Sequence, residues 1–117
     1  MSIDNVLASV AVKDIKAASK WYARLFERAG SMQMPGVAEW SFPRGGSLQI
    51  YELPERAGQG SFTLAVNNIE DEIRKLLALS IDASQRASNE RVNTVMISDP
   101  DGNHIAFAEA IDHSLAR

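Results

Sequence analysis

Apolar and polar residues alternate along two separate stretches of the chain, at residues 6–12 and 61–66. The first stretch places Leu7, Ser9 and Ala11 between four more strongly apolar positions, Val6, Ala8, Val10 and Val12. The second places Ser61, Thr63 and Ala65 between Phe62, Leu64 and Val66. A period of two is typical of a β-strand with one face in the core. Both stretches are therefore predicted as strands.

An amphipathic helix is predicted after each of these strands. Apolar residues recur there at helical spacing, first at Ile15, Ala18, Trp21, Tyr22, Leu25 and Phe26, then at Ile69, Ile73, Leu76 and Leu77. Asp14 and Asn68 stand just before the two helices, where a side-chain oxygen can accept the free N–H groups of the first turn. We expect the first helix to end at Gly30, because glycine adopts the left-handed conformation that often terminates helices.

The chain repeats one plan twice. Residues 9–16 align with residues 63–70, and both segments pass from strand through polar cap to helix. Further strands are predicted at 38–42 and 47–52, and again at 95–97 and 104–109, while residues 82–93 are expected to form loop or edge strand. A Gly-rich connection at 54–60 separates the modules, which we place at 1–57 and 58–117 and expect to form one structural domain together.

Turn chemistry joins the paired strands in each module. Pro43-Arg44-Gly45-Gly46 and Asp99-Pro100-Asp101-Gly102-Asn103 both combine a proline, which presets one torsion, with glycine, which allows a positive one. Asp99 and Asp101 are therefore assigned to the turn rather than to acid–base or metal chemistry. Glu52 and Glu109 end their predicted strands, and we expect both to be solvated.

Composition excludes several classes of function. The chain has 117 residues and no cysteine, which rules out disulfides, thiolate metal sites and a cysteine nucleophile. A net charge of −3 argues against electrostatic binding to nucleic acid or to an anionic membrane. No apolar run approaches the roughly 18 residues that span a bilayer, and no secretory signal is visible. We expect a soluble cytoplasmic protein.

Taken together, these motifs resemble the vicinal oxygen chelate superfamily, which includes glyoxalase I, bleomycin resistance proteins and extradiol dioxygenases. The resemblance rests on the module order, the Val-Lys-Asp-Ile opening at 12–15, the helix with Trp21-Tyr22 and Leu25-Phe26, and the Asp-Pro-Asp-Gly-Asn turn before Ile105-Ala106-Phe107. It covers nearly the whole chain, from residue 5 to residue 109. It implies an α+β fold of two tandem βαβββ modules that form a curved mixed sheet with a cleft, and a homodimer.

The resemblance also identifies the positions that hold a metal in the metal-dependent members. There each module supplies two His, Gln or Glu ligands, one from its first strand and one from its last. The matching positions in this chain are Leu7, Gln49, Ser61 and Ala106. Leucine and alanine have no donor atom and a serine hydroxyl is a poor ligand, whereas a catalytic metal needs several protein donors. We therefore predict no metal and no other cofactor.

Four residues are predicted to contact a small organic ligand, and no catalytic residue is identified. Gln49 and Tyr51 share one face of strand 47–52. His104 shares a face with Ala106 and could titrate near neutral pH or hydrogen-bond a ligand, although a partly solvated strand end is the alternative. Trp40 could stack on a flat molecule, although core packing is the alternative. His113 is assigned no role.

Three functions are compatible with these residues. The first is a metal-free protein that binds a small organic molecule in a dimeric cleft. The second is a divergent glyoxalase-type lyase or dioxygenase-like enzyme that uses ligands supplied by its substrate, or a base such as His104. The third is a structural or interaction protein with a vestigial cleft. Leu7 and Ala106 at metal positions favour the first over the second.

Overall fold

The computed structural model describes residues 2–111, so His113 lies outside the described residues. Its elements follow the order β1 (Leu7–Val12), α1 (Ile15–Phe26), β2 (Ser31–Met34), β3 (Val37–Ser41), β4 (Ser47–Glu52), a 3₁₀ turn η1 (Pro54–Arg56), β5 (Ser61–Ala65), α2 (Ile69–Ala78), β6 (Gln85–Ser88), β7 (Val92–Ser98) and β8 (His104–Ala110). The predicted fold of two tandem βαβββ modules is confirmed.

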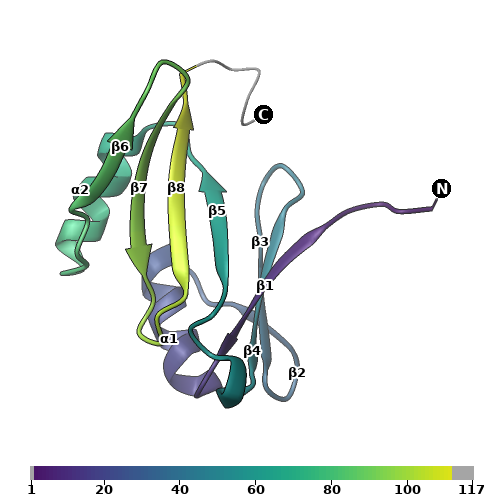
Figure 1. The fold of residues 1–117 in the computed structure, drawn as a ribbon. Coiled ribbons are helices and arrows are strands. Elements are labelled where there is room, and N and C mark those ends of the chain that lie inside the picture. Colours follow the sequence, from purple (N-terminus) through teal and green to yellow (C-terminus); the bar gives the residue numbers. More distant parts are fainter. Residues whose placement is uncertain (1, 112–117) are drawn as a thin grey trace. The chain divides into compact units, whose positions relative to one another are not determined.

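The strands form two four-stranded mixed sheets with the same topology. The first sheet has the order β1-β4-β3-β2 and the second β5-β8-β7-β6, an order that can be followed in Figure 1 for the second sheet. In each, the first and last strands of the module pair in parallel and the remaining pairs are antiparallel. Leu7 lies opposite Ser47 in one sheet and Ser61 opposite His104 in the other, so the predicted repeat extends to the register.

The chain divides into two compact units, and neither is one continuous segment of the sequence. The first unit runs to Gly60 and also contains Pro100–Asn103, while the second contains Ser61–Asp99 and the chain from His104 onward. Each unit holds one sheet and one helix, and each is described below by itself. No helix in the described part of the chain is both long and apolar enough to cross a bilayer.

An aromatic cluster under α1 forms the core of the first unit. Tyr22 and Trp40 are fully buried, with ring centroids 5.9 Å apart, and the ring of Phe26 lies 5.6 Å from that of Trp40. The sheet contributes the buried residues Val10, Val12, Ala38, Leu48 and Ile50. The predicted alternation is correct for β4, whereas β1 buries the three consecutive residues Val10, Ala11 and Val12 and leaves Val6 and Ala8 exposed.

The first helix begins as predicted but ends earlier. The carboxylate of Asp14 accepts the N–H groups of Lys16 and Ala17. The helix then ends at Phe26, and Glu27 rather than Gly30 adopts the left-handed conformation, with φ of 59°. Gly30 is needed for another reason, because a Cβ atom there would lie 2.7 Å from the ring of Trp40. Its role is to let that ring pack directly on the backbone.

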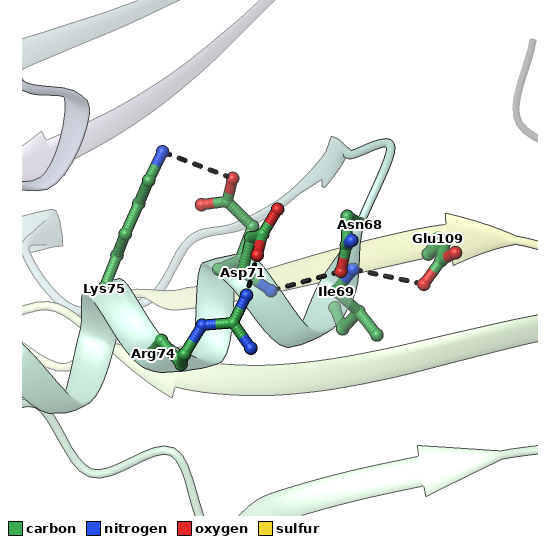
Figure 2. A network of polar contacts seen from close by, with 7 residues as sticks. Asn68, Ile69, Asp71, Arg74, Lys75 and Glu109 are labelled. Carbon is green, nitrogen blue, oxygen red and sulfur yellow. Dashed lines mark hydrogen bonds and ion pairs between the residues drawn. The ribbon is translucent and has the colours of Figure 1, made fainter.

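The second unit packs α2 against β7 and β8 around an aliphatic core. The largest contributors are Ile69, Ile73, Leu76, Val95, Ile97, Ile105 and Phe107. The side chain of Asn68 accepts the N–H of Asp71, as predicted for the helix cap. The side chain of Asp71 pairs with Arg74 on the surface of α2, and Lys75 pairs with Glu72 (Figure 2).

Glu52 and Glu109 have a structural role that the sequence did not indicate. Glu109 accepts the backbone N–H of Ile69 at 3.1 Å, and Glu52 accepts that of Ile15 at 3.0 Å (Figure 2 shows the Glu109 contact). In each module the last strand therefore places a carboxylate at the N-terminus of the helix, where the helix dipole favours negative charge. Glu52 is exposed, as expected, but it is not merely solvated.

The turn before β8 is built into the first unit. The side-chain amide of Asn103 is fully buried, donates to the carbonyl of Ala11 at 2.9 Å and accepts the N–H of Gly60 at 2.9 Å. The carboxylate of Asp101 accepts the N–H of Lys13 at 3.0 Å. Gly58 has φ of +84°, and a Cβ atom there would lie 2.2 Å from the carbonyl oxygen of Asp101. The predicted turn is confirmed, and it also anchors the end of β1.

Candidate functional site

The face of the first sheet that α1 does not cover is here called the open face. Ala38, Trp40, Leu48 and Ile50 point toward the helix, so the alternate residues of the same strands line the open face. These are Val37, Glu39 and Ser41 of β3, Ser47, Gln49 and Tyr51 of β4, and Leu7, Ser9 and Ala11 of β1. Ala11 is buried, whereas the residues of β3 and β4 on this face are half-buried or exposed.

A hydrogen-bonded polar pair occupies the middle of the open face. Glu39 and Gln49 lie directly opposite one another in the β3–β4 register. The amide nitrogen of Gln49 donates to a carboxylate oxygen of Glu39 at 2.8 Å. Both side chains are half-buried. Because a carboxylate can only accept hydrogen bonds, this contact orients the amide of Gln49 with its nitrogen toward Glu39.

The polar pair separates an apolar end of the open face from a hydroxyl end. Tyr51 lies opposite Val37, and Val37 lies opposite Met34 of β2, whose side chain is 61% exposed. At the other end Ser47 lies opposite Ser41, with 3.5 Å between the hydroxyl oxygens. Apolar and aromatic groups beside a few placed polar groups are the usual lining of a small-molecule site.

Trp40 does not belong to this face. Its side chain is 1% exposed, its ring packs against Tyr22 and Phe26, and its indole N–H donates to the carbonyl of Arg28 at 3.0 Å. Trp40 lies opposite Leu48, which also points toward α1. The structure thus places Trp40 in the core, the alternative role considered for it, and it is removed from the candidate site.

His104 lies in the second unit and is exposed. It begins β8, opposite Ser61 of β5 and Ser98 of β7. Its register places it on the face of the second sheet that also carries Ala106, as the alternation predicted. Gln49 and Tyr51 of β4 thus lie together in the first unit, beside Glu39 of β3. His104 belongs to a separate surface of uncharged residues in the second unit, Ser61, Thr63, Met96, Ser98 and Ala106.

Sequence reasoning missed Glu39. The available signal was its position between Ala38 and Trp40, where one charged residue alternates with two apolar ones. That pattern alone does not tell which side of the strand faces the helix. The register with Leu48 and Ile50 decides it, and this register places Glu39 beside Gln49.

A solved structure that is similar over nearly the whole chain decides the family. It is described as a glyoxalase/bleomycin resistance protein from Catenulispora acidiphila, is 33% identical, and aligns over 90% of this chain and 96% of its own with a TM-score of 0.80. The chain belongs to the glyoxalase/bleomycin resistance family, within the vicinal oxygen chelate superfamily. The predicted family is confirmed.

More distant members of this fold are also similar. TnmS3, an antibiotic binding protein from a Streptomyces species, is 22% identical with a TM-score of 0.81 over 94% of this chain and 98% of its own. A lactoylglutathione lyase from Agrobacterium tumefaciens is 17% identical with a TM-score of 0.78 over 97% of each chain. At these identities the likeness concerns the fold alone. No family model and no curated protein matches the sequence.

The residues at the family's metal positions do not fit a metal in this chain. In the first unit Leu7 has no donor atom, so the carbonyl oxygen of Gln49 is the one donor at the two positions there. In the second unit Ala106 has no donor atom and Ser61 has a hydroxyl group, and among the residues opposite them His104 is the one strong ligand. Within residues 2–111, no group of three or more His, Cys, Asp or Glu side chains is placed to hold a metal ion.

Proposed function

We propose that this protein binds a small organic molecule on the open face of its first sheet, without using a metal and without turning the molecule over. The observation that carries this proposal is the Glu39–Gln49 pair, 2.8 Å apart and half-buried beside Tyr51 and Val37. Partial burial of a carboxylate carries a desolvation cost, and the helix-side core of the unit is already built without it. A ligand-binding role explains why such a group stands there.

Similar proteins support binding rather than any particular chemistry. The 33% identical relative is described as a glyoxalase/bleomycin resistance protein, and TnmS3 is described as an antibiotic binding protein. Glyoxalase-type catalysis is the weaker candidate, because three of the four residues at the family's metal positions, Leu7, Ser61 and Ala106, lack a suitable donor. His104, the base considered for an enzyme, lies among Ser61 and Ser98. A cytoplasmic location remains a prediction from the sequence.

Titration with 1-naphthol, a flat and uncharged aromatic probe, tests the proposed site. We expect the NMR signals of the Gln49 side-chain amide and of Tyr51 to shift on binding. Gln49→Ala removes one hydrogen-bonding group from the half-buried pair, so it should raise the Kd about fivefold. Tyr51→Ala removes an aromatic contact and should raise it about two- to tenfold.

Gln59→Ala is the matched control, because Gln59 is an exposed glutamine in the connection before β5. Its Kd should equal that of the unchanged protein, and the thermal midpoints of all three variants should stay close together. Shifts confined to other parts of the chain would refute the proposed site. Protein purified without chelators should contain no stoichiometric divalent metal. One metal ion per chain would contradict metal-free binding and favour a glyoxalase-type enzyme.

We also propose that the protein is a homodimer, joined through the segment that leads into β1. Three large apolar side chains are exposed along it, Ile3 by 74%, Val6 by 79% and Leu7 by 46%. Figure 1 shows the segment as an extended arm, and β1 is an outer strand of its sheet. Neighbouring exposed apolar side chains at a sheet edge mark a surface that associates, and a second copy offers the same apolar edge in return.

Light scattering after size exclusion tests the homodimer. We expect the protein to have twice the chain mass of 12.8 kDa, and Val6→Asp to have the mass of one chain. Leu77→Asp is the matched control, because Leu77 on α2 is also a large exposed apolar residue, at 56%. It should remain dimeric. A monomeric parent protein, or a Val6→Asp variant that still dimerises, would contradict the proposal.

A further inference from the structure

The Glu39–Gln49 pair offers a ligand more hydrogen-bond acceptors than donors. Gln49 directs its amide nitrogen at one carboxylate oxygen of Glu39, at 2.8 Å, which uses one of the two N–H groups of that amide. The second N–H of Gln49 is left, together with two acceptors, the carbonyl oxygen of Gln49 and the second carboxylate oxygen of Glu39. An anionic ligand at this point would meet these two oxygens and the negative charge of the carboxylate. A ligand with N–H groups would satisfy both atoms.

The described neighbours of Glu39 are uncharged. In the β2–β3–β4 register its lateral neighbours are Ser31 and Gln49, and along β3 on the same face they are Val37 and Ser41. The ion pairs Arg74–Asp71 and Lys75–Glu72 both lie on α2 and do not involve Glu39. A cationic ligand would therefore meet this half-buried carboxylate in surroundings where charge–charge attraction is stronger than in bulk water.

The apolar end of the open face begins two residues along the strands from this pair. Tyr51, Val37 and Met34 lie next to one another there. Successive residues on one face of a strand are separated by roughly 7 Å, which a ring with a short polar substituent can span. Aromatic faces also attract cations, so Tyr51 favours the same kind of ligand as Glu39.

We infer that the ligand of this site is an organic nitrogen cation, with an apolar or aromatic body over Tyr51 and at least two N–H donors directed at Glu39 and Gln49. Protonated amines, amidines and guanidines belong to this class, whereas carboxylates and phosphate esters are excluded from it. This inference rests on the proposed function, which requires only that the open face bind a small organic molecule.

Three probes of the same shape test the inference, namely benzamidine, benzamide and benzoate. Each carries a phenyl ring with a planar three-atom head group, and their charges are +1, 0 and −1. Titrated against the protein and followed by the Gln49 side-chain NMR signal, benzamidine should bind most tightly and benzoate most weakly. We expect a difference of about tenfold or more between the two charged probes, because charge-assisted hydrogen bonds are the stronger ones.

Glu39→Gln keeps the shape of the side chain and removes its charge. It should abolish the preference for benzamidine over benzamide, while Glu55→Gln, at an exposed glutamate in η1, should preserve it. Equal binding of benzoate and benzamidine, or an unchanged preference in Glu39→Gln, would overturn this inference and leave the proposed function standing. If neither 1-naphthol nor any of the three probes shifts the Gln49 and Tyr51 signals, both are overturned.

Discussion

Trp40→Ala should lower the free energy of unfolding by about 3–5 kcal/mol, as expected for an aromatic side chain removed from a core. The indole is 1% exposed, touches Tyr22 and Phe26, and lies against the backbone of Gly30. Its removal leaves a cavity between α1 and the sheet and also deprives the carbonyl of Arg28 of its 3.0 Å hydrogen bond. Urea unfolding followed by far-UV circular dichroism measures the loss.

Trp21→Ala is the matched control for this prediction. Trp21 lies on α1 next to Tyr22, and the two rings form a T-shaped pair with centroids 4.9 Å apart, but the side chain of Trp21 is only partly buried. Its removal should cost clearly less than that of Trp40. If Trp40→Ala were as stable as the parent protein and instead lost binding of 1-naphthol, Trp40 would be a ligand contact and its placement in the core would be wrong.

Asn103→Ala should lower the free energy of unfolding by about 2–4 kcal/mol, because one buried and one partly buried backbone group lose the side chain that they bond. The carbonyl of Ala11 loses its donor and the N–H of Gly60 loses its acceptor, both at 2.9 Å in the intact protein. Asn103 is fully buried, so water does not replace the lost contacts at the surface. Thermal and urea unfolding of the purified variant measure this effect.

Two further variants separate the hydrogen bonds from the mere loss of atoms. Asn103→Asp keeps an acceptor for Gly60 but sets a carboxyl group against the carbonyl of Ala11, so its deficit should be larger at pH 7 than at pH 4, where more of the carboxyl is protonated. Asn5→Ala, which removes an exposed asparagine bonded to Gly45, should be close to neutral. A deficit below about 1 kcal/mol for Asn103→Ala would contradict the anchoring role.

Much of the fold could be predicted from local patterns. Alternation identified β1, β4, β5 and β8, and helical spacing identified α1 and α2. These elements each bury one face, so their sequence carries the period of their own geometry. β2 was not predicted, and residues 82–93 were expected to form loop or edge strand. All four residues of β2 and of β6 are exposed, so neither strand buries an apolar face.

Predictions about the site were less complete for a related reason. Gln49 and Tyr51 were identified because alternation within one strand tells which residues share a face. Trp40 and Glu39 lie on the neighbouring strand, and their faces depend on the register of the β3–β4 hairpin. That register follows from the turn, in which Phe42 and Gly46 close the loop through a 2.8 Å backbone bond. A shift of one residue would have exchanged the two side chains.

The helix caps show the same division between local and distant contacts. Asp14 and Asn68 bond N–H groups two or three residues away, and their residue types predicted this. Glu52 and Glu109 accept hydrogen bonds from N–H groups 37 and 40 residues away, and nothing in their local sequence predicts such contacts. Asn103 likewise marked a turn by its neighbours, while its bonds to Ala11 and Gly60 required the folded chain.

The amino-acid sequence by itself therefore determined the repeated βαβββ plan, the family, and the lack of suitable donors at Leu7, Ser61 and Ala106. Each of these follows from residue type and spacing along one strand or helix. Only the tertiary structure decided that Trp40 is core, that Glu39 joins Gln49 on the open face, and that Asn103 secures β1. These depend on which strands become neighbours and in what register, and that is set by packing across the sheet rather than by any single segment.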